Sequence, residues 1–464
     1  MTAHSNEQSL LDRLADILDD TALLTADDVS ERYHADWSGS NPCRPTALLK
    51  PKTTRQLSEV MAVCHQFDQP VVVQGGLTGL SGGATPQHGE IAVSLERMTG
   101  IEELDATAMT LTAWAGTPLQ LLHDAATEQG LFVPLDLAAR GSCTIGGNVA
   151  TNAGGTEVIR YGMARSMVLG LEAVLADGTV INAMNKLVKN NSGYDLKHLF
   201  IGTEGTLGIV TRVVLQLQPM APGTHTALCT LNSYEDVTRL LNQLKRSLGS
   251  GLTGFELMWA NYFDKVLECV PGTQNPFEQP FPYYLLVEYK DSDDTAATQR
   301  FESALFRQLE AGLIQDAVIA QSHQHAAAFW QIRDGIGELF QVIGPVSTQD
   351  VSLAVDKIGR FAVDLEKRLE EKYGDIGVLL FGHIGDNNLH VCAYTGREED
   401  KARLNNDMML LIGEYGGAIS AEHGIGVLKR DYLSLSRNDN EIALMKSIKA
   451  ALDPKGILNP GRVV

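Results

Sequence analysis

The 464-residue chain has an ordinary apolar fraction of 44% and a formal net charge of −20 at pH 7. This composition is typical of a folded, enzyme-sized protein with room for two or three domains, and the acidic excess argues against binding to nucleic acid or to anionic membranes. Six scattered cysteines without a CxxC spacing favour free, mostly buried thiols over a disulfide framework.

The N-terminal sequence MTAHSNEQSLLDRLADILDD is acidic and amphipathic. This pattern argues against a secretory signal or an Arg-rich transit peptide, and no stretch of the sequence approaches the length of a membrane span. We therefore expect a cytoplasmic protein. Leucines at 10, 14 and 18 predict an amphipathic helix over residues 9–20, inside an N-terminal helical segment of residues 1–45.

Helix-type and strand-type patterns alternate over the next part of the sequence, up to residue 220. They predict a helix at 54–67 and strands at 71–73, 91–95, 168–181 (a hairpin around Asp177-Gly178) and 209–218. The proline-rich segment PMAPG then predicts the first major domain boundary.

The second half of the sequence mixes amphipathic helices, such as residues 235–248, with strands, such as residues 283–289. Over residues 224–380 this mixture predicts an α+β unit whose antiparallel sheet carries helices on one face. A final helix at about 440–452 precedes an extended tail with two prolines.

Three glycine-rich segments occur in the first half of the sequence: VVVQGGLTGLSGG at 71–83, PLDLAARGSCTIGGNVATNAGG at 134–155 and GTEGTLGIVT at 202–211. The first follows a strand but contains neither GxGxxG in register nor GxxxxGK, which excludes a Rossmann NAD site and a Walker A loop. Alone it could be a plain glycine-rich turn. The second packs so many small residues together that we expect no regular element there. Three such segments indicate a backbone surface for a flat, extended ligand with a pyrophosphate.

Two further motifs carry metal-ligating residues. FGHIGDNNLHV at 381–391 places His383 and His390 seven residues apart around turn formers, which predicts a loop between two strand ends with both rings facing one point. SAEHGIG at 420–426 adds Glu422 and His423. A two-histidine, one-carboxylate set suits Zn²⁺, Mn²⁺ or Fe²⁺, whereas isolated histidines of this kind are usually satisfied core residues.

The order of the glycine segments resembles the flavin domain of the vanillyl-alcohol oxidase superfamily. GHIGDNNLH, SAEHGIG and the terminal LDPKGILNPG narrow the resemblance to FAD-dependent D-2-hydroxy acid dehydrogenases, over about residues 30–464. This family implies an α+β fold with a two-subdomain FAD-binding domain (46–220), a substrate or cap domain with an antiparallel sheet (221–418) and a C-terminal segment (419–464) that returns to the flavin and completes the active site.

The resemblance implies FAD, held without a covalent bond because residues 74–83 contain no histidine, cysteine or tyrosine. The residues it assigns to FAD are Gly75, Gly76, Leu77, Thr78, Gly79, Leu80, Pro134, Asp136, Gly141, Ser142, Ile145, Gly146, Gly147, Asn148, Ala150, Thr151, Asn152, Gly154, Gly155, Gly205, Ile209 and Asn459.

The resemblance also assigns the roles in the reaction. His383, His390 and Glu422 are expected to bind Zn²⁺ or Mn²⁺, and His423 to act as the base. Arg333, in a W-x-x-R motif, is expected to bind the substrate carboxylate, together with Asn388. The reaction is oxidation of a D-2-hydroxy acid to the 2-oxo acid, with hydride transfer to FAD.

The hydroxyglutarate branch has three further polar residues that bind a second substrate carboxylate. The present sequence has Gly337 in place of a threonine, Thr348 in place of a lysine and Cys392 in place of an asparagine. Because each charged hydrogen bond contributes about 1.5–3 kcal/mol, these changes favour D-lactate or a D-2-hydroxy acid of greater length.

Several alternatives stay open on the sequence alone. D-2-hydroxyglutarate dehydrogenase proper, a glycolate oxidase-type subunit and an O₂-using oxidase fit the same motifs, and a metallohydrolase or a flavin-binding subunit without turnover would fit part of them. No cytochrome or iron–sulfur motif is present, so we expect electrons to leave for an external carrier, such as an electron-transfer flavoprotein or a quinone. The resemblance implies a homodimer.

Overall fold

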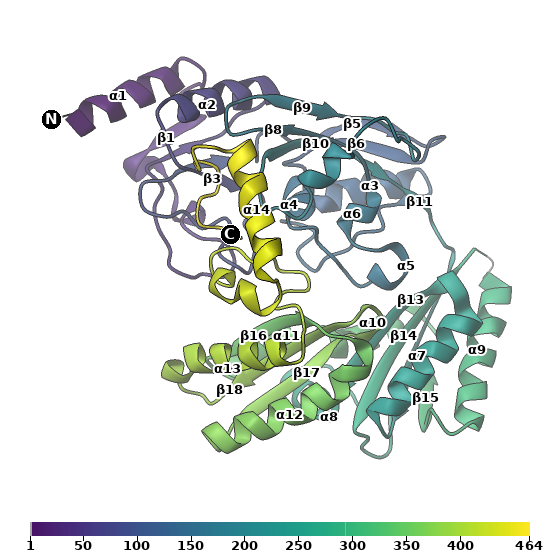
Figure 1. The fold of residues 1–464 in the computed structure, drawn as a ribbon. Coiled ribbons are helices and arrows are strands. Elements are labelled where there is room, and N and C mark those ends of the chain that lie inside the picture. Colours follow the sequence, from purple (N-terminus) through teal and green to yellow (C-terminus); the bar gives the residue numbers. More distant parts are fainter. Residues whose placement is uncertain (1, 293) are drawn as a thin grey trace. The chain divides into compact units, whose positions relative to one another are not determined.

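The computed structural model describes residues 2–292 and 294–464, which form two compact units (Figure 1). The first unit contains the sequence up to Gly155, Tyr161–Met220 and Glu422–Val464. The second unit contains Thr156–Arg160 and Ala221–Ala421. The polypeptide therefore leaves the first unit twice and returns to it with its C-terminal part.

Two main sheets build the first unit. A four-stranded sheet has the order β1-β2-β4-β3, with β1 (Leu23–Thr25) antiparallel and β2 (Ala47–Leu49), β4 (Ile91–Ser94) and β3 (Val71–Gln74) parallel. A five-stranded antiparallel sheet has the order β5 (Ile101–Asp105), β6 (Thr110–Trp114), β10 (Ile209–Gln216), β8 (Val168–Val174) and β9 (Val180–Ala183). The predicted hairpin around Asp177 is confirmed, since β8 and β9 pair antiparallel.

Helices α1 (Thr2–Ala15) and α2 (Thr54–Gln66) pack on the core of this unit, α2 through Leu57, Met61 and Cys64. The prediction for α2 is confirmed, but α1 ends five residues before the predicted boundary at residue 20. Acidic residues follow Ala15 in the sequence DILDD, and negative charge at a helix C-terminus is unfavourable.

The other α-helices described in this unit are α3 (Leu119–Glu128), α4 (Ile145–Ala150), α6 (Ala164–Met167) and α14 (Asp439–Leu452). A two-stranded ribbon pairs β7 (Leu131–Phe132) with β11 (Gln218–Pro219), and the short helix α5 (Val158–Tyr161) spans the passage between the units.

The expectation that residues 134–155 contain no regular element is wrong. The helix α4, of six residues, lies inside this segment despite two glycines in its sequence. A Cβ on Gly146 would lie 2.5 Å from the Cβ of Ala115, so close packing beside β6 requires glycine here and holds the short helix in place.

The C-terminal tail joins the first unit as an additional edge of the four-stranded sheet. Leu458 forms a parallel bridge with Val71 of β3, and the N–H of Val71 donates to the carbonyl of Ile457 (2.7 Å). Four residues further on, the fully buried Arg462 pairs with the buried carboxylate of Glu90. The tail is thus part of the core of the first unit, as the resemblance implied.

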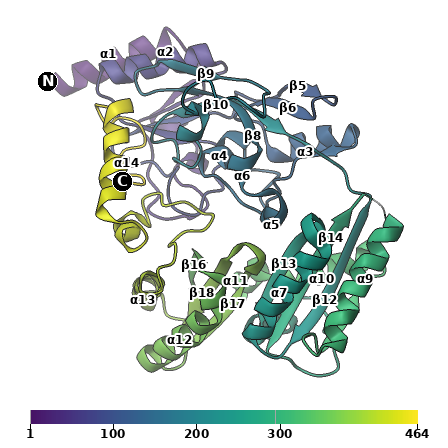
Figure 2. The same ribbon diagram turned by 45° about the vertical axis from the view of Figure 1, so that its right-hand side comes forward.

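A seven-stranded, fully antiparallel sheet forms the centre of the second unit (Figure 2). Its order is β15 (Asp316–Ile319), β12 (Gly223–Leu231), β14 (Tyr283–Asp291), β13 (Leu252–Trp259), β17 (Gly377–His383), β18 (Asn388–Tyr394) and β16 (Ser347–Ser352).

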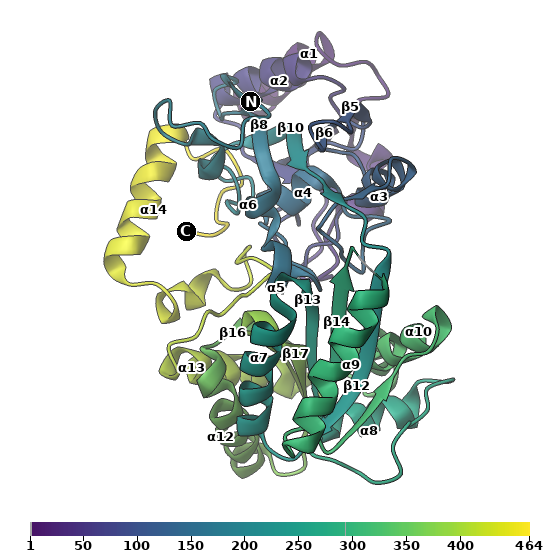
Figure 3. The same ribbon diagram turned by 90° about the vertical axis from the view of Figure 1, so that its right-hand side faces the viewer.

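Helices cover both faces of this sheet (Figure 3), so the prediction of helices on one face is wrong. One group contains α7 (Tyr234–Leu248), α9 (Asp294–Glu310), α12 (Val355–Tyr373) and α13 (Lys401–Glu414), and the other α8 (Ala260–Cys269), α10 (His323–Arg333) and α11 (Ile336–Val342). The reason lies in β14, where six consecutive residues are buried. A continuous buried run is typical of a strand that is covered on both sides, whereas a one-sided sheet alternates. None of the helices that the structure describes is long and apolar enough to cross a membrane.

Candidate active site

The glycine loop after β3 packs directly against the second glycine-rich segment. A Cβ on Gly76 would lie 2.1 Å from the carbonyl oxygen of Ser142, and one on Gly75 would lie 2.7 Å from the hydroxyl oxygen of Thr144. Real Cβ atoms do not approach other atoms so closely, so both positions require glycine. The two loops therefore expose backbone rather than side chains where they meet.

The third glycine segment and the C-terminal tail reach the same region of the first unit. The N–H of Glu204 donates to the carbonyl of Ala150 at the end of α4 (2.8 Å). Asn459 joins the tail to both neighbours: its Oδ1 accepts from the N–H of Val73 (2.8 Å) and its Nδ2 donates to the carbonyl of Glu204 (2.6 Å). All residues that the resemblance assigns to FAD lie on these four segments of the first unit.

Two buried polar atoms on the second glycine segment fit a bound polar ligand. Thr144 Oγ1 and Asp136 Oδ1 have no hydrogen-bond partner within the part of the protein that the structure describes. Buried polar atoms are almost always paired, so such atoms are expected to meet a ligand or water. Together with the glycine cradle, they fit an extended cofactor with polar groups, as FAD is.

The second unit places the two histidines on a hairpin. His383 ends β17, a short 3₁₀ turn follows (Ile384–Asp386), and β18 begins at Asn388. The ring centroids of His383 and His390 are 5.3 Å apart. The predicted loop between two strand ends is therefore confirmed, and the two imidazoles are neighbours, with His390 inside β18.

Each histidine faces a carboxylate on the neighbouring strand. Glu256 of β13 is the cross-strand partner of His383, and Asp350 of β16 is the cross-strand partner of His390. Partners in register place their side chains on the same face of the sheet. Both carboxylates are buried, with 1% exposure each. Neither residue was predicted from the sequence, where the glutamate inside the apolar run FELMW was the only signal for Glu256.

Arg333, at the end of α10, joins the same cluster. Its Nε donates to Glu256 (2.8 Å), His383 Nδ1 lies 2.8 Å from the same carboxylate, and Arg333 Nη2 lies 3.3 Å from His383 Nε2. Burial raises the pKa of Glu256, but the charges and hydrogen bonds of His383 and Arg333 outweigh it and lower the pKa to about 2. Glu256 and Arg333 are therefore a buried ion pair beside the histidine.

Asn388, at the start of β18, is buried at 4% exposure. Neither its Nδ2 nor its Oδ1 has a hydrogen-bond partner among the described residues. An amide with both polar atoms buried and unpaired costs free energy unless a ligand or water satisfies it. This side chain fits a ligand-binding position five residues from His383 along the hairpin.

Asp350 also fixes the backbone that leads to Glu422. Its Oδ2 accepts from the N–H of Ala421 (3.2 Å), the last residue of the second unit. Glu422 is bonded to Ala421 and is the first residue of the polypeptide's return to the first unit. Glu422 therefore directly follows the residue whose N–H donates to Asp350.

The loop of residues 423–426 is anchored in the first unit. Ser81 Oγ donates to the carbonyls of His423 and Gly424 (3.0 Å each), and the carboxylate of Glu204 accepts from the N–H groups of Ile425 (2.6 Å) and Gly426 (2.7 Å). Burial raises the pKa of Glu204, and the two N–H bonds oppose that rise. Glu204 and Ser81 therefore hold His423 beside the first glycine loop, and neither was predicted from the sequence.

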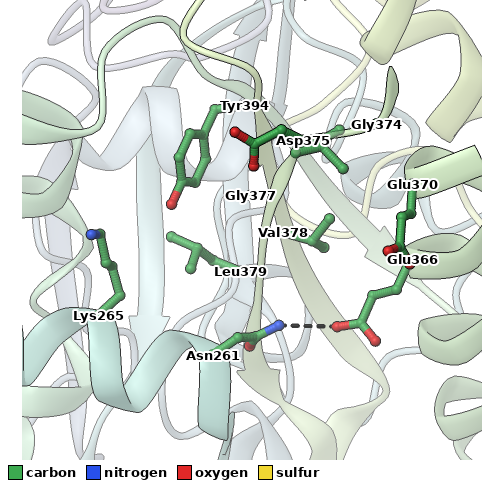
Figure 4. Close-up of a pocket in the computed structure, with 11 residues that line it drawn as sticks. Asn261, Lys265, Glu366, Glu370, Gly374, Asp375, Gly377, Val378, Leu379 and Tyr394 are labelled. Carbon is green, nitrogen blue, oxygen red and sulfur yellow. Dashed lines mark hydrogen bonds between the residues drawn. The ribbon is translucent and has the colours of Figure 1, made fainter. Parts of the chain in front are cut away.

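A pocket of about 680 Å³ lies elsewhere in the second unit (Figure 4). Gly377, at the start of β17, and Tyr394, at the end of β18, line it, so it lies at the strand ends opposite His383 and Asn388. Its lining includes Glu366, which accepts from Asn261 (3.0 Å), and none of the predicted site residues. It is separate from the histidine cluster.

Comparison with known proteins agrees with this geometry. The model of an FAD binding domain matches residues 45–184, and that of the C-terminal domain of FAD linked oxidases matches residues 222–463. The fold is similar to p-cresol methylhydroxylase with substrate bound (TM-score 0.78, 19% identity, 99% of this chain and 97% of that one). It is also similar to alkyldihydroxyacetonephosphate synthase (TM-score 0.75, 16% identity, 97% and 85%). The protein is thus an FAD-dependent oxidoreductase with the vanillyl-alcohol oxidase fold.

The curated relatives narrow the family. The sequence is 41% identical to the mitochondrial D-2-hydroxyglutarate dehydrogenase of Arabidopsis thaliana (94% of this chain, 78% of that protein) and 40% identical to D-2-hydroxyglutarate dehydrogenase of Xanthomonas citri pv. viticola (93% and 92%). It is 36% identical to a putative mitochondrial D-lactate dehydrogenase of Schizosaccharomyces pombe (94% and 84%). The protein belongs to the FAD-linked D-2-hydroxy acid dehydrogenases.

Proposed function

We propose that this dehydrogenase oxidises a D-2-hydroxy acid with a short or apolar side group, and that it uses a divalent metal to bind the substrate. The observation that carries the proposal is the cluster of Arg333, Glu256 and His383, because it joins a carboxylate-binding cation to a metal-ligating imidazole. The unpaired buried amide of Asn388 on the same hairpin supports a ligand there.

The metal ligands in this proposal are His383, His390 and Glu422, and Zn²⁺ or Mn²⁺ suits the donor set. The 5.3 Å separation of the two rings supports a shared ion. Such an ion, when bound, supplies Lewis acidity that lowers the pKa of a hydroxyl and a fixed point for two substrate oxygens.

The protein's own residues share the work on the substrate. Arg333 binds the carboxylate through its guanidinium fork, and Asn388 hydrogen-bonds a substrate oxygen. His423, in its neutral form, accepts the hydroxyl proton. The four segments of the first unit would hold FAD without a covalent bond, and FAD would supply the two-electron acceptor for the hydride that leaves Cα as the hydroxyl carbon becomes a carbonyl.

Three positions support a substrate without a second carboxylate. Cys392 is fully buried in an apolar cluster of the second unit that also contains Tyr262 and Leu339. Thr348 is its cross-strand partner, and a Cβ on Gly337 would meet no atom within 4 Å. This part of the protein therefore offers apolar surface and open space rather than a cation.

D-2-hydroxyglutarate is the second candidate substrate, because the Arabidopsis and Xanthomonas relatives are named for it. The proposal also keeps the domain boundaries at residues 46–220, 221–418 and 419–464, an external electron acceptor (an electron-transfer flavoprotein or a quinone) and a homodimer. The cytoplasmic location stays a prediction, and the mitochondrial name of the Arabidopsis relative points to a different compartment for that protein.

The test is anaerobic mixing of the FAD-loaded protein with D-lactate, longer D-2-hydroxy acids, D-2-hydroxyglutarate, D-malate and the L-forms while the flavin band is followed. We expect bleaching by D-forms only, fastest with the short or apolar acids, lost after chelation and restored by zinc or manganese. Fastest reduction by D-2-hydroxyglutarate would overturn the assignment of the substrate's side group. No bleaching by any of them would overturn the proposed reaction.

A further inference from the structure

Glu256 contacts two groups that the proposed function uses for different purposes. Its carboxylate accepts from Arg333 Nε (2.8 Å), and His383 Nδ1 lies 2.8 Å from the same carboxylate. The side chain is 1% exposed and lies on β13, in the interior of the seven-stranded sheet. A buried carboxylate in this position fixes both partners at once.

The contacts of His383 select one tautomer. An arginine guanidinium can only donate, so His383 Nε2, 3.3 Å from Arg333 Nη2, must be the accepting nitrogen. An ionised carboxylate can only accept, so His383 Nδ1 must carry the proton that faces Glu256. The two contacts agree on the tautomer with its lone pair on Nε2, the nitrogen that would bind a metal in place of the Arg333 contact.

Arg333 is held as firmly as the histidine. The ring of Phe381 lies 4.9 Å from its guanidinium carbon, and the Tyr262 hydroxyl donates to its backbone carbonyl (2.8 Å). With Nε bound to Glu256 and Nη2 3.3 Å from His383 Nε2, the planar fork is held from two sides. The direction of that fork therefore depends on the position of the Glu256 carboxylate.

We propose that Glu256 is a positioning residue that fixes the metal-binding tautomer of His383 and the direction of Arg333 through a single carboxylate. This inference rests on the proposed function, since it assigns to His383 a metal and to Arg333 the substrate carboxylate. It adds that the affinity for the metal and the affinity for the substrate both depend on the Glu256 carboxylate. Loss of this carboxylate weakens both, although Glu256 touches neither ligand.

The experiment compares Glu256→Gln with the wild-type holoenzyme. FAD-loaded protein is freed of metal with a chelator and titrated with Zn²⁺ against a chromophoric competitor. Removal of a hydrogen-bond partner behind a metal ligand typically lowers metal affinity by about 10- to 100-fold, and we expect a loss in that range. At saturating Zn²⁺ we expect the KM for the 2-hydroxy acid to stay raised, because Arg333 has also lost its partner.

A matched control separates positioning from general stability. Glu288 is a buried glutamate on β14, the next strand of the same sheet, and it accepts from the indole N–H of Trp330 (3.2 Å) instead of a predicted ligand. Glu288→Gln is expected to lower Tm and leave the Zn²⁺ affinity unchanged. Glu256→Asp keeps the charge on a shorter side chain and is expected to recover part of the affinity, and it serves as the second variant if Glu256→Gln fails to fold.

The outcomes distinguish this inference from the function it rests on. A folded, FAD-loaded Glu256→Gln protein that binds Zn²⁺ like wild type, while His383→Ala abolishes binding, would overturn the role of Glu256 alone. Zinc uptake that does not depend on His383 would overturn the proposed metal site and this inference together. A parallel loss of Zn²⁺ affinity in Glu256→Gln and Glu288→Gln would assign Glu256 a merely structural role and overturn the inference.

Discussion

The first unit builds its ligand surface from backbone, and the second unit builds its surface from buried charge. Around Gly75 and Gly76 the structure allows no Cβ, so the candidate FAD surface presents backbone there. Around His383 the geometry depends on Glu256 and Arg333, whose charges are buried and paired. Different substitutions should therefore disable the two units: an added methyl group in the first, and the loss of a charge in the second.

His423 is anchored in the first unit, and its proposed role is that of the base. His423→Asn should lower the rate of flavin reduction by about 10²- to 10⁴-fold, the usual contribution of a general base. FAD content and Tm should stay near wild type. Stopped-flow reduction under anaerobic conditions measures the rate, and an unchanged rate would remove His423 from the mechanism.

Gly76→Ala tests the backbone surface of the first unit. The new Cβ would meet the Ser142 carbonyl, which cannot move like a flexible side chain, so the glycine loop must shift. Overpacking of this kind costs about 1–3 kcal/mol, and we expect a matching loss of FAD affinity. Released flavin is measured by fluorescence after dialysis. Gly337→Ala, where a Cβ meets nothing within 4 Å, is the control and should retain FAD.

The pair Thr348→Lys and Cys392→Asn tests the proposed preference for a substrate without a second carboxylate. The two positions are cross-strand partners on β16 and β18, so the new cation and amide would lie together. One charged hydrogen bond contributes about 1.5–3 kcal/mol, so kcat/KM for D-2-hydroxyglutarate should rise about tenfold or more relative to D-lactate. The ratio of the two substrates in one preparation is the measurement. A wild-type protein that already prefers D-2-hydroxyglutarate would contradict the premise.

The sequence predicted the candidate FAD-binding segments of the first unit better than the charged cluster around His383 in the second. The glycine segments are contiguous, and each carries its own signal, while the individual FAD residues are those that the family resemblance implies. His383, His390, Glu422 and His423 also lie in short motifs. Glu256 could not be found in this way, since its link to His383 depends on the pairing of β13 with β17, 127 positions apart in the sequence.

The same reason explains why helices on both faces and the short helix α4 were not predicted. The burial of β14 on two sides depends on which helices return to the sheet, and α4 depends on close packing with Ala115. Local patterns report the tendency of a segment, and tertiary neighbours decide the outcome. Pairs of residues across strands, such as Asp350 opposite His390, depend on these tertiary neighbours and not on local patterns.

The smallest expected effect is that of replacing Glu204. This residue combines a charged side chain with a glycine-rich backbone segment within the first unit. It is a half-buried carboxylate that accepts from two backbone N–H groups, so here a charge positions a glycine loop. Glu204→Gln keeps the shape but allows the amide to accept through one oxygen only, and the loop that carries His423 should loosen. Because small misplacements of a catalytic group are costly, we expect flavin reduction to slow by about tenfold, with FAD retained.

The control is Glu172→Gln in β8, a buried glutamate of the same unit that accepts from the hydroxyls of Thr54 (2.6 Å) and Thr211 (2.9 Å). It should lower Tm without changing the rate of flavin reduction. Equal rates for Glu204→Gln and wild type would mean that Ser81 and the glycines hold the loop without help. If instead Glu204→Gln is slow and Glu172→Gln is fast, the Glu204 carboxylate contributes to the catalytic rate through its hydrogen bonds to the backbone next to His423.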